Sequence, residues 1–259
     1  MKTKIIFEAS IHHTGTHFVR GLLTDSIFHS RSSYFGTIYV TDKCDEYGLV
    51  DSLGRHYVVG FEGLLDLIRV CLANMEKQRE ENIDIAIYHM HFGGYYNNEF
   101  IPISIMEGLI KRFDTIIPIR DPLLALLTAE TRFPGMDHTH IVSGFHYLSQ
   151  LDHETVSFFP IDLPLFFQQR KERIINLFTS FGIPISDEVL SAWSDFPVFG
   201  DTTGRKRFKL GGLKEEYHRG NLEEIIKVIP TEYAYLKAME KYIRPFLESL
   251  GYEDLLWWQ

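Results

Sequence analysis

The sequence contains few cysteines and no long apolar run, and these absences argue against a disulfide-rich protein and a membrane protein. Two of the 259 residues are cysteine, Cys44 and Cys71, and they are not spaced as a CxxC pair. Two cysteines cannot build a disulfide framework and fit a reducing compartment. No stretch of about 18 apolar residues occurs, and the early run Ile5-Ile6-Phe7 is too short for a signal peptide. We therefore expect a cytoplasmic protein with no membrane partner.

Positive charge is also scarce. The chain has 26 lysines and arginines against 35 aspartates and glutamates, which gives a formal net charge of -9. Binding to nucleic acid normally depends on a basic face that neutralises phosphates, so we expect no nucleic-acid partner. An anionic small ligand would have to be held by local geometry.

Hydrophobic residues make up 45% of the chain, and no repeat, low-complexity tract or linker divides it. We therefore expect a single domain over residues 1–259. Apolar runs alternate with segments of helical periodicity. The sequence predicts strands at 4–7, 34–41, 55–60, 83–88, 115–119 and 156–159, and helices at 18–27, 61–79, 103–112, after Pro122, at 171–181 and over 221–250 with breaks near Pro230 and Pro245. This alternation predicts a three-layer α/β fold with a mostly parallel central sheet flanked by helices.

The residues after the first strand predict a turn and the start of a helix. Backbone N–H groups at a helix N-terminus lack intrahelical acceptors, and the macrodipole adds positive charge, so an anion can bind there. Gly15 allows close backbone approach, and the hydroxyls of Thr14 and Thr16 are further donors. The alternative is an ordinary helix start with Thr14 as the N-cap. A Walker A loop is excluded because Thr16 stands where that motif has lysine.

A second segment delivers an arginine to the end of a buried strand. The run Thr115-Ile116-Ile117-Pro118-Ile119 is followed by Arg120, and Thr128 comes eight residues later on the next helix. Ligands of open α/β sheets bind outside the carboxyl ends of strands, so both side chains suit a phosphate. The alternative is that Arg120 pairs with a structural carboxylate such as Asp121.

Together these segments resemble the cytosolic-type sulfotransferases, which use 3′-phosphoadenosine 5′-phosphosulfate (PAPS). The family's first motif, a strand followed by Pro-Lys-Ser-Gly-Thr-Thr-Trp, aligns with His12-His13-Thr14-Gly15-Thr16-His17-Phe18. Its second, Arg-x-Pro with a serine eight positions after the arginine, aligns with Arg120-Asp121-Pro122 and Thr128. The resemblance implies a P-loop-like form of the predicted fold, with PAPS as donor and the 3′,5′-bisphosphate PAP as product.

The resemblance also implies roles for single residues. His13, Thr14, Gly15, Thr16 and His17 would surround the 5′-phosphosulfate. Phe18 would stack on adenine, and Arg120 with Thr128 would bind the 3′-phosphate. The main departure is His13, which replaces a lysine that donates to the leaving group; a histidine does this only when protonated or in the proper tautomer.

A histidine pair follows the strand that begins at Ile83. In Tyr88-His89-Met90-His91-Phe92, His91 falls on the position of the family's Lys-Thr-His general base. A neutral imidazole can remove the acceptor proton at physiological pH. His89 and His91 share one face of an extended strand, so a metal pair is the rival function, but a third ligand at suitable spacing is missing and we predict no metal. The predicted catalytic residues are thus His91 and His13.

The most basic stretch of the chain is Gly204-Arg205-Lys206-Arg207-Phe208-Lys209-Leu210-Gly211-Gly212. It resembles the family's late Arg-Lys-Gly segment, which implies that Arg205, Lys206 and Arg207 contact the nucleotide. The alternative is a solvated basic loop. From Phe159-Pro160-Ile161-Asp162-Leu163, which replaces a Tyr-Glu-Asp-Leu-like segment of the family, no role is carried over.

The predicted function is transfer of a sulfuryl group from PAPS to a hydroxyl or amine of a small-molecule or saccharide acceptor. The alternatives are a nucleotide or small-molecule kinase and a non-catalytic nucleotide-binding protein with this fold. His138 and His140 follow Pro134-Gly135 and are expected in a loop. The aromatic pair Trp257-Trp258 belongs either in the core or at a contact with a second subunit, which would make a homodimer.

Overall fold

The computed structural model describes residues 4–16, 18–19, 22–23, 33–40, 46–50, 56–60, 85–91, 100–152, 156–183, 185–194 and 212–259. Within these ranges one seven-stranded sheet has the order β4-β3-β2-β5-β1-β6-β7. Its strands are β1 (Lys4–Ser10), β2 (Ser33–Val40), β3 (Glu46–Val50), β4 (His56–Gly60), β5 (Ile85–His91), β6 (Asp114–Ile119) and β7 (Ser157–Pro160). The pairs from β2 through β5, β1 and β6 to β7 are parallel, and β3 and β4 extend the sheet antiparallel. The predicted α/β class with a mostly parallel sheet is confirmed.

The strand order creates a switch point at β1. After β1 the chain passes to one side of it for β2 and β5, and then to the other side for β6 and β7. In open sheets, ligands bind outside the carboxyl ends of strands at such a point. The carboxyl ends of the parallel strands β1, β5, β6 and β7 therefore share one edge of the sheet.

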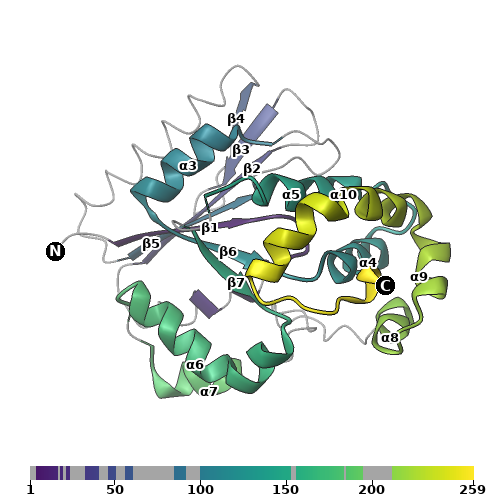
Figure 1. Cartoon of the computed structure of the whole chain (residues 1–259). Coiled ribbons are helices and arrows are strands. Elements are labelled where there is room, and N and C mark those ends of the chain that lie inside the picture. Colours follow the sequence, from purple (N-terminus) through teal and green to yellow (C-terminus); the bar gives the residue numbers. More distant parts are fainter. Residues whose placement is uncertain are drawn as a thin grey trace.

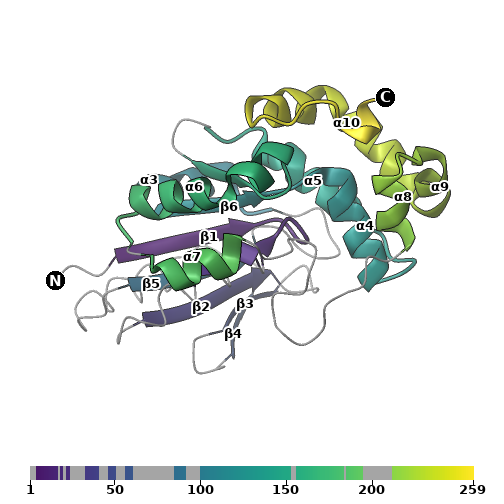
Figure 2. The same ribbon diagram turned by 90° about the horizontal axis from the view of Figure 1, so that it is seen from below.

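The helices within the described ranges are α3 (Ile103–Arg112), α4 (Pro122–Arg132), α5 (Thr139–Leu148), α6 (Pro164–Ser180), α7 (Asp187–Ser194), α8 (Gly212–His218), α9 (Leu222–Val228) and α10 (Pro230–Ser249), with a 3₁₀ turn η2 (Leu256–Trp258). Helices flank the sheet, and α10 packs along α5 (Figure 1). Figure 2 shows β1 and β2 pointing toward the end of the molecule where α4, α8 and α9 lie. These helices therefore gather at the edge where a ligand is expected.

Several elements differ from the prediction. No strand was predicted between those at 34–41 and 55–60, but β3 (Glu46–Val50) lies there and pairs with strands on both sides. A loop was expected at His140, but His140 lies in α5, whose buried Ile141, Val142, Phe145 and Leu148 repeat at helical spacing. Helices α7 and α8 were not predicted, and α6 begins seven residues earlier than expected. The predicted helix at 61–79 lies outside the described residues.

Helix α10 also corrects the expected break at Pro245, because it continues through this proline. A proline inside a helix costs about 3 kcal/mol. The neighbours Ile243, Phe246 and Leu247 are all buried against the core, and this packing outweighs the penalty.

The core includes the C-terminal aromatic residue Trp257, which is 0% exposed. Trp257 therefore presents no surface to a second subunit, and its place is in the core of its own chain. Its neighbour Trp258 is half-buried, with the Arg244 guanidinium carbon 4.7 Å from the ring centroid. None of the helices in the described ranges has the length and apolar character needed to cross a bilayer.

Candidate functional site

The loop after β1 turns directly into a helix. The backbone N–H groups of Phe18 and Val19 donate to the Gly15 carbonyl at 2.9 and 3.2 Å, so the helix begins at Gly15. Two residues of the turn have left-handed backbone, His13 at φ 65° and Gly15 at φ 104°. The Thr14 hydroxyl donates to the carbonyl of Ile11 at 2.9 Å and holds the turn rather than capping the helix. The alternative role of Thr14 as N-cap is therefore not observed.

Two features make the N-terminus of this helix suitable for binding an anion. Thr16, in the first helical turn, is 6% exposed, and its hydroxyl has no hydrogen-bond partner among the described residues. A buried hydroxyl without a partner is costly, and a bound ligand would satisfy it. Gly15 packs so closely on Ile161 that a Cβ would lie 2.1 Å from its Cδ1. The loop backbone therefore lies directly on the residue that follows β7.

Imidazoles gather around this loop. His91 ends β5, and its Nδ1 lies 3.3 Å from the hydroxyl oxygen of Ser10, its register partner on β1. The His12 ring stacks on His91 at 4.1 Å between centroids with an 18° interplanar angle. The rings of His140 and His12 meet edge to face at 5.7 Å between centroids, and the His13 centroid lies 6.3 Å from that of His12. The sequence predicted His91 and His13 here, whereas His12 and His140 were not expected to join them.

Two of these histidines, His13 and His140, are mainly neutral at physiological pH because burial lowers their pKa values. Burial, and then the neighbouring charges of His12 and Arg132, hold the pKa of His13 well below its usual 6.5. Burial, followed by His138, lowers the pKa of His140 to about 4. Of the two ways in which His13 was expected to replace lysine, only the neutral tautomer with its N–H directed at the leaving group is therefore available. In the part of the chain that the structure describes, no group of three His, Cys, Asp or Glu side chains is placed to hold a metal ion.

Arg120 follows β6 and is 5% exposed. Its Nη1 donates to the Thr128 hydroxyl at 3.0 Å, and that hydroxyl donates to the Leu124 carbonyl at 2.8 Å. The local sequence explains this placement. Asp121 caps α4 by accepting the Leu123 N–H at 2.8 Å, and Pro122 takes the first helical position, where its missing N–H costs nothing.

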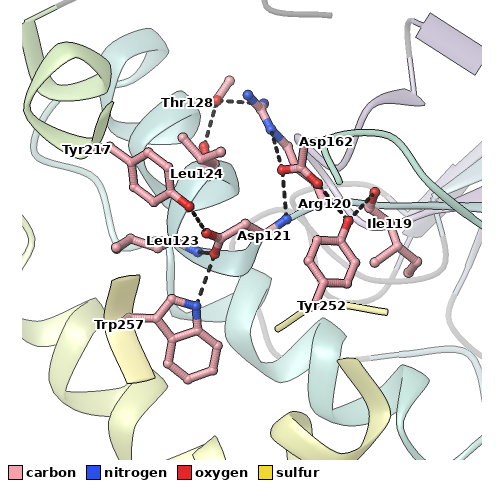
Figure 3. A network of polar contacts seen from close by, with 10 residues as sticks. All are labelled: Ile119, Arg120, Asp121, Leu123, Leu124, Thr128, Asp162, Tyr217, Tyr252 and Trp257. Atoms are coloured by element: carbon pink, nitrogen blue, oxygen red, sulfur yellow. Dashed lines mark hydrogen bonds and ion pairs between the residues drawn. The ribbon is translucent and has the colours of Figure 1, made fainter. Parts of the chain in front are cut away.

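The carboxylate beside Arg120 is Asp162, which the sequence analysis passed over. Its Oδ2 lies 3.7 Å from Arg120 Nε and accepts the backbone N–H of Asp121 at 3.0 Å. Its Oδ1 accepts the hydroxyl of Tyr252 at 2.6 Å (Figure 3). Asp162 follows β7, the parallel neighbour of β6, so the meeting of these strand ends was the signal that would have identified it.

The alternative that Arg120 pairs with a structural carboxylate is therefore observed, with Asp162 in place of the suggested Asp121. Asp121 is bonded elsewhere. Its Oδ1 accepts Trp257 Nε1–H at 3.0 Å, and its Oδ2 accepts the Tyr217 hydroxyl in a very short hydrogen bond. Figure 3 shows both aromatic side chains reaching Asp121 from elements remote in the sequence. The C-terminal part of the chain therefore supports the turn between β6 and α4.

Burial disfavours the charged form of Asp121, Asp162 and Arg120. It raises the pKa of Asp121 to about 7, with the charge of Asp162 acting in the same direction. It also raises the pKa of Asp162, although Arg120 opposes this. Burial lowers the pKa of Arg120, but a guanidinium stays protonated in proteins. Near neutral pH the site therefore holds one fixed cation, with Asp121 partly protonated.

Two consecutive residues after β7 connect the loop that follows β1 with the pair Arg120 and Thr128. Ile161 packs on Gly15 of the first loop, and Asp162 lies beside Arg120. Phe18 differs from its expected role because its ring is 2% exposed and lies under the Arg170 guanidinium at 5.9 Å. A ring covered in this way has no open face for adenine. The predicted binding residues His17, Arg205, Lys206 and Arg207 lie outside the described residues.

Comparison with known proteins gives distant likeness in structure and no match in sequence. No family model matches the chain, and no curated protein matches it in sequence. Among solved structures, the chain is similar to the mouse sulfotransferase SULT7A1 complexed with PAP. The TM-score is 0.43 and the sequence identity is 12%, over 80% of this chain and 68% of that chain. A likeness at this level does not identify any ligand-binding residue.

Proposed function

We propose that this chain transfers a sulfuryl group from PAPS to a hydroxyl or amine acceptor. PAPS carries two separate anionic groups, the 5′-phosphosulfate and the 3′-phosphate. The observation that carries the proposal is the junction at Ile161 and Asp162, which joins the glycine loop after β1 to the Arg120–Thr128 pair. One ligand with two anionic ends fits two adjacent anion sites.

Each anionic end would meet a different set of donors. The helix N-terminus at Gly15 and the buried hydroxyl of Thr16 would hold the 5′-phosphosulfate through backbone N–H groups and one O–H. The guanidinium of Arg120 and the hydroxyl of Thr128 would hold the 3′-phosphate, for which a planar fork of donors is well suited. This division accounts for anion binding in a chain with a net charge of -9.

In the transfer step, a bond forms between the acceptor oxygen or nitrogen and sulfur. The bond from sulfur to the bridging oxygen of the 5′-phosphate breaks, and its electron pair leaves with PAP. His91 would take the acceptor proton on Nε2, provided that its Nδ1–H is donated to the Ser10 hydroxyl oxygen 3.3 Å away. Loop N–H groups and the neutral His13 N–H would stabilise the charge on the leaving group.

Calorimetric titration with PAP, AMP and ATP tests the proposal. Arg120→Lys keeps the positive charge but loses the fork of donors. We expect PAP to bind at least 10-fold more tightly than AMP, and this preference to disappear in Arg120→Lys while the fold, followed by circular dichroism, is retained. Equal affinity for PAP and AMP in the wild type would exclude a 3′-phosphate site. Binding of ATP that depends on Mg²⁺ would instead favour the kinase.

The neutral state of His13 favours one second candidate, a protein that binds the nucleotide without turnover. The family's lysine supplies a positive charge at this position, whereas the lowered pKa of His13 removes it. His13→Lys separates the two functions. Transfer to simple phenol or amine acceptors that appears only in His13→Lys would support the non-catalytic protein, and transfer by the wild type would exclude it.

A further inference from the structure

The carboxylate beside Arg120 is oriented away from the geometry of a strong ion pair. A carboxylate beside a buried arginine commonly accepts two parallel N–H bonds, each about 2.7–2.9 Å long. Here the Oδ2 of Asp162 lies 3.7 Å from Arg120 Nε, and that oxygen also accepts the backbone N–H of Asp121. The carboxylate attracts the guanidinium without making a short hydrogen bond to Nε.

The second oxygen of Asp162 is held by Tyr252. This tyrosine follows α10 and is 2% exposed. Its hydroxyl lies 2.6 Å from Asp162 Oδ1 and 3.1 Å from the Ile119 carbonyl oxygen, and its one proton is donated to the nearer acceptor, the Asp162 carboxyl oxygen. Figure 3 shows Tyr252 on the side of Asp162 that faces away from the guanidinium. The tyrosine therefore directs Oδ1 away from Arg120.

This orientation affects the affinity of the site for anions. A phosphate group that binds Arg120 competes with Asp162 for the same N–H donors. If Asp162 turned both oxygens to the guanidinium, each N–H would have to leave a charged partner before it could bind phosphate. The bond from Tyr252 removes one of the two competing oxygens.

We propose that Tyr252, by binding Asp162 Oδ1, keeps the guanidinium of Arg120 available to a phosphate group of the ligand. Tyr252 and Asp162 are then positioning residues, since neither needs to touch the ligand. The inference rests on the proposed function in one respect only, that Arg120 binds a phosphate group. The inference does not depend on the chemical nature of the rest of the ligand.

The test is a set of variants titrated with PAP and with inorganic pyrophosphate. Tyr252→Phe removes only the hydroxyl, so Asp162 can turn to Arg120, and we expect affinity for both probes to fall about 10-fold. Asp162→Asn removes the competing charge, and we expect affinity equal to or above that of the wild type. The double variant should recover the affinity of Asp162→Asn, because the hydroxyl has no carboxylate left to direct.

A matched control is Tyr235→Phe in α10, which removes a hydroxyl that lies 3.1 Å from the Oγ of Ser143 in α5. We expect it to leave both affinities unchanged. A purely structural role for Tyr252 predicts that the double variant binds as weakly as Tyr252→Phe or more weakly. That result, or wild-type affinity in Tyr252→Phe, overturns the inference. If Tyr252→Phe does not fold, the affinities of Asp162→Asn decide the test. Weaker binding of PAP and pyrophosphate by Asp162→Asn than by the wild type then overturns the inference.

Pyrophosphate separates this inference from the proposed function. If the wild type binds pyrophosphate but does not prefer PAP over AMP, the proposed function fails, and the pyrophosphate affinities of the variants still decide the role of Tyr252. If the wild type binds neither PAP nor pyrophosphate, Arg120 is not an anion site, and both proposals are overturned.

Discussion

Arg120 donates from Nη1 to the hydroxyl of Thr128 at 3.0 Å, although the two residues belong to different elements. Asp121 caps α4 immediately after β6, and Thr128 lies two turns into that helix, within reach of the Arg120 side chain. The contact therefore follows from the short sequence Arg-Asp-Pro and from the eight-residue spacing. A phosphate that binds the guanidinium would also lie within reach of the hydroxyl.

Thr128→Ala tests this contact. Removing the hydroxyl should weaken PAP binding by about 10-fold, in line with the loss of one hydrogen bond to a charged group. Thr131→Ala is a matched control, because both hydroxyls donate to the carbonyl four residues earlier in α4, at 2.8 Å for Thr128 and 2.6 Å for Thr131. Calorimetry should show unchanged PAP affinity for Thr131→Ala. Equal losses in the two variants would assign the effect to the helix and not to the ligand.

The stability of the protein should depend on the ionisation of Asp121. Burial raises the pKa of Asp121 to about 7 from its usual 3.8, so the folded protein holds a proton that the unfolded chain has released. This contribution to stability is full below about pH 4 and is lost as pH rises toward 7, on the order of 1.4 kcal/mol for each pH unit crossed. Asp121→Asn cannot ionise and should lack this loss.

The measurement is urea unfolding of the wild type and of Asp121→Asn at pH values from 4 to 8. The difference in unfolding free energy between the two proteins removes the contributions of the histidines, which both proteins share. We expect the wild type to lose stability relative to the variant as pH rises. A difference that stays constant over this range would show that folding does not raise the pKa of Asp121.

Gly15→Ala should be more damaging than the same change at Gly135. Both glycines have left-handed backbone, at φ 104° and 76°, which costs an alanine about 1–2 kcal/mol. At Gly135 nothing lies within 4 Å of the new Cβ, whereas at Gly15 it would lie 2.1 Å from Ile161 Cδ1. This overlap should add about 1–3 kcal/mol to the loss of stability.

Urea unfolding of the two glycine variants measures this difference. Ile161→Val deletes the overlapping Cδ1 atom, so in the Gly15→Ala background it should restore part of the lost stability. Equal losses at Gly15 and Gly135 would mean that the loop moves away from Ile161 without cost.

The sequence predicted the parts of this structure that depend on local patterns. The helix Ile103–Arg112 has the predicted bounds, and Arg120 meets Thr128 as their spacing indicated. The helix at Thr139–Leu148 was not predicted, because Pro134-Gly135 indicates a loop, although Ile141, Val142, Phe145 and Leu148 repeat at helical spacing. The helical spacing was a correct local signal, but the loop signal of Pro134-Gly135 pointed to the opposite conclusion.

Other parts of the site have no local signal. Asp162 meets Arg120 only because β6 and β7 are neighbours in the sheet. Tyr252 is one of 13 tyrosines, and no feature of its neighbourhood in the sequence distinguishes it from the rest. Its bond to Asp162 depends on where α10 ends in space. Such contacts between distant segments are fixed by tertiary packing and cannot be read from spacing.

The bonds from Tyr252 and Trp257 also set an order of events during biosynthesis. Tyr252 follows Asp162 by 90 residues, and Trp257 follows Asp121 by 136 residues. At about 5–20 residues per second, a ribosome adds Tyr252 roughly 5–18 s after Asp162. Until then a nascent chain has its arginine beside a carboxylate that no tyrosine restrains. On the proposal for Tyr252, the growing chain would acquire its affinity for phosphate ligands only after Tyr252 has been added and has reached Asp162.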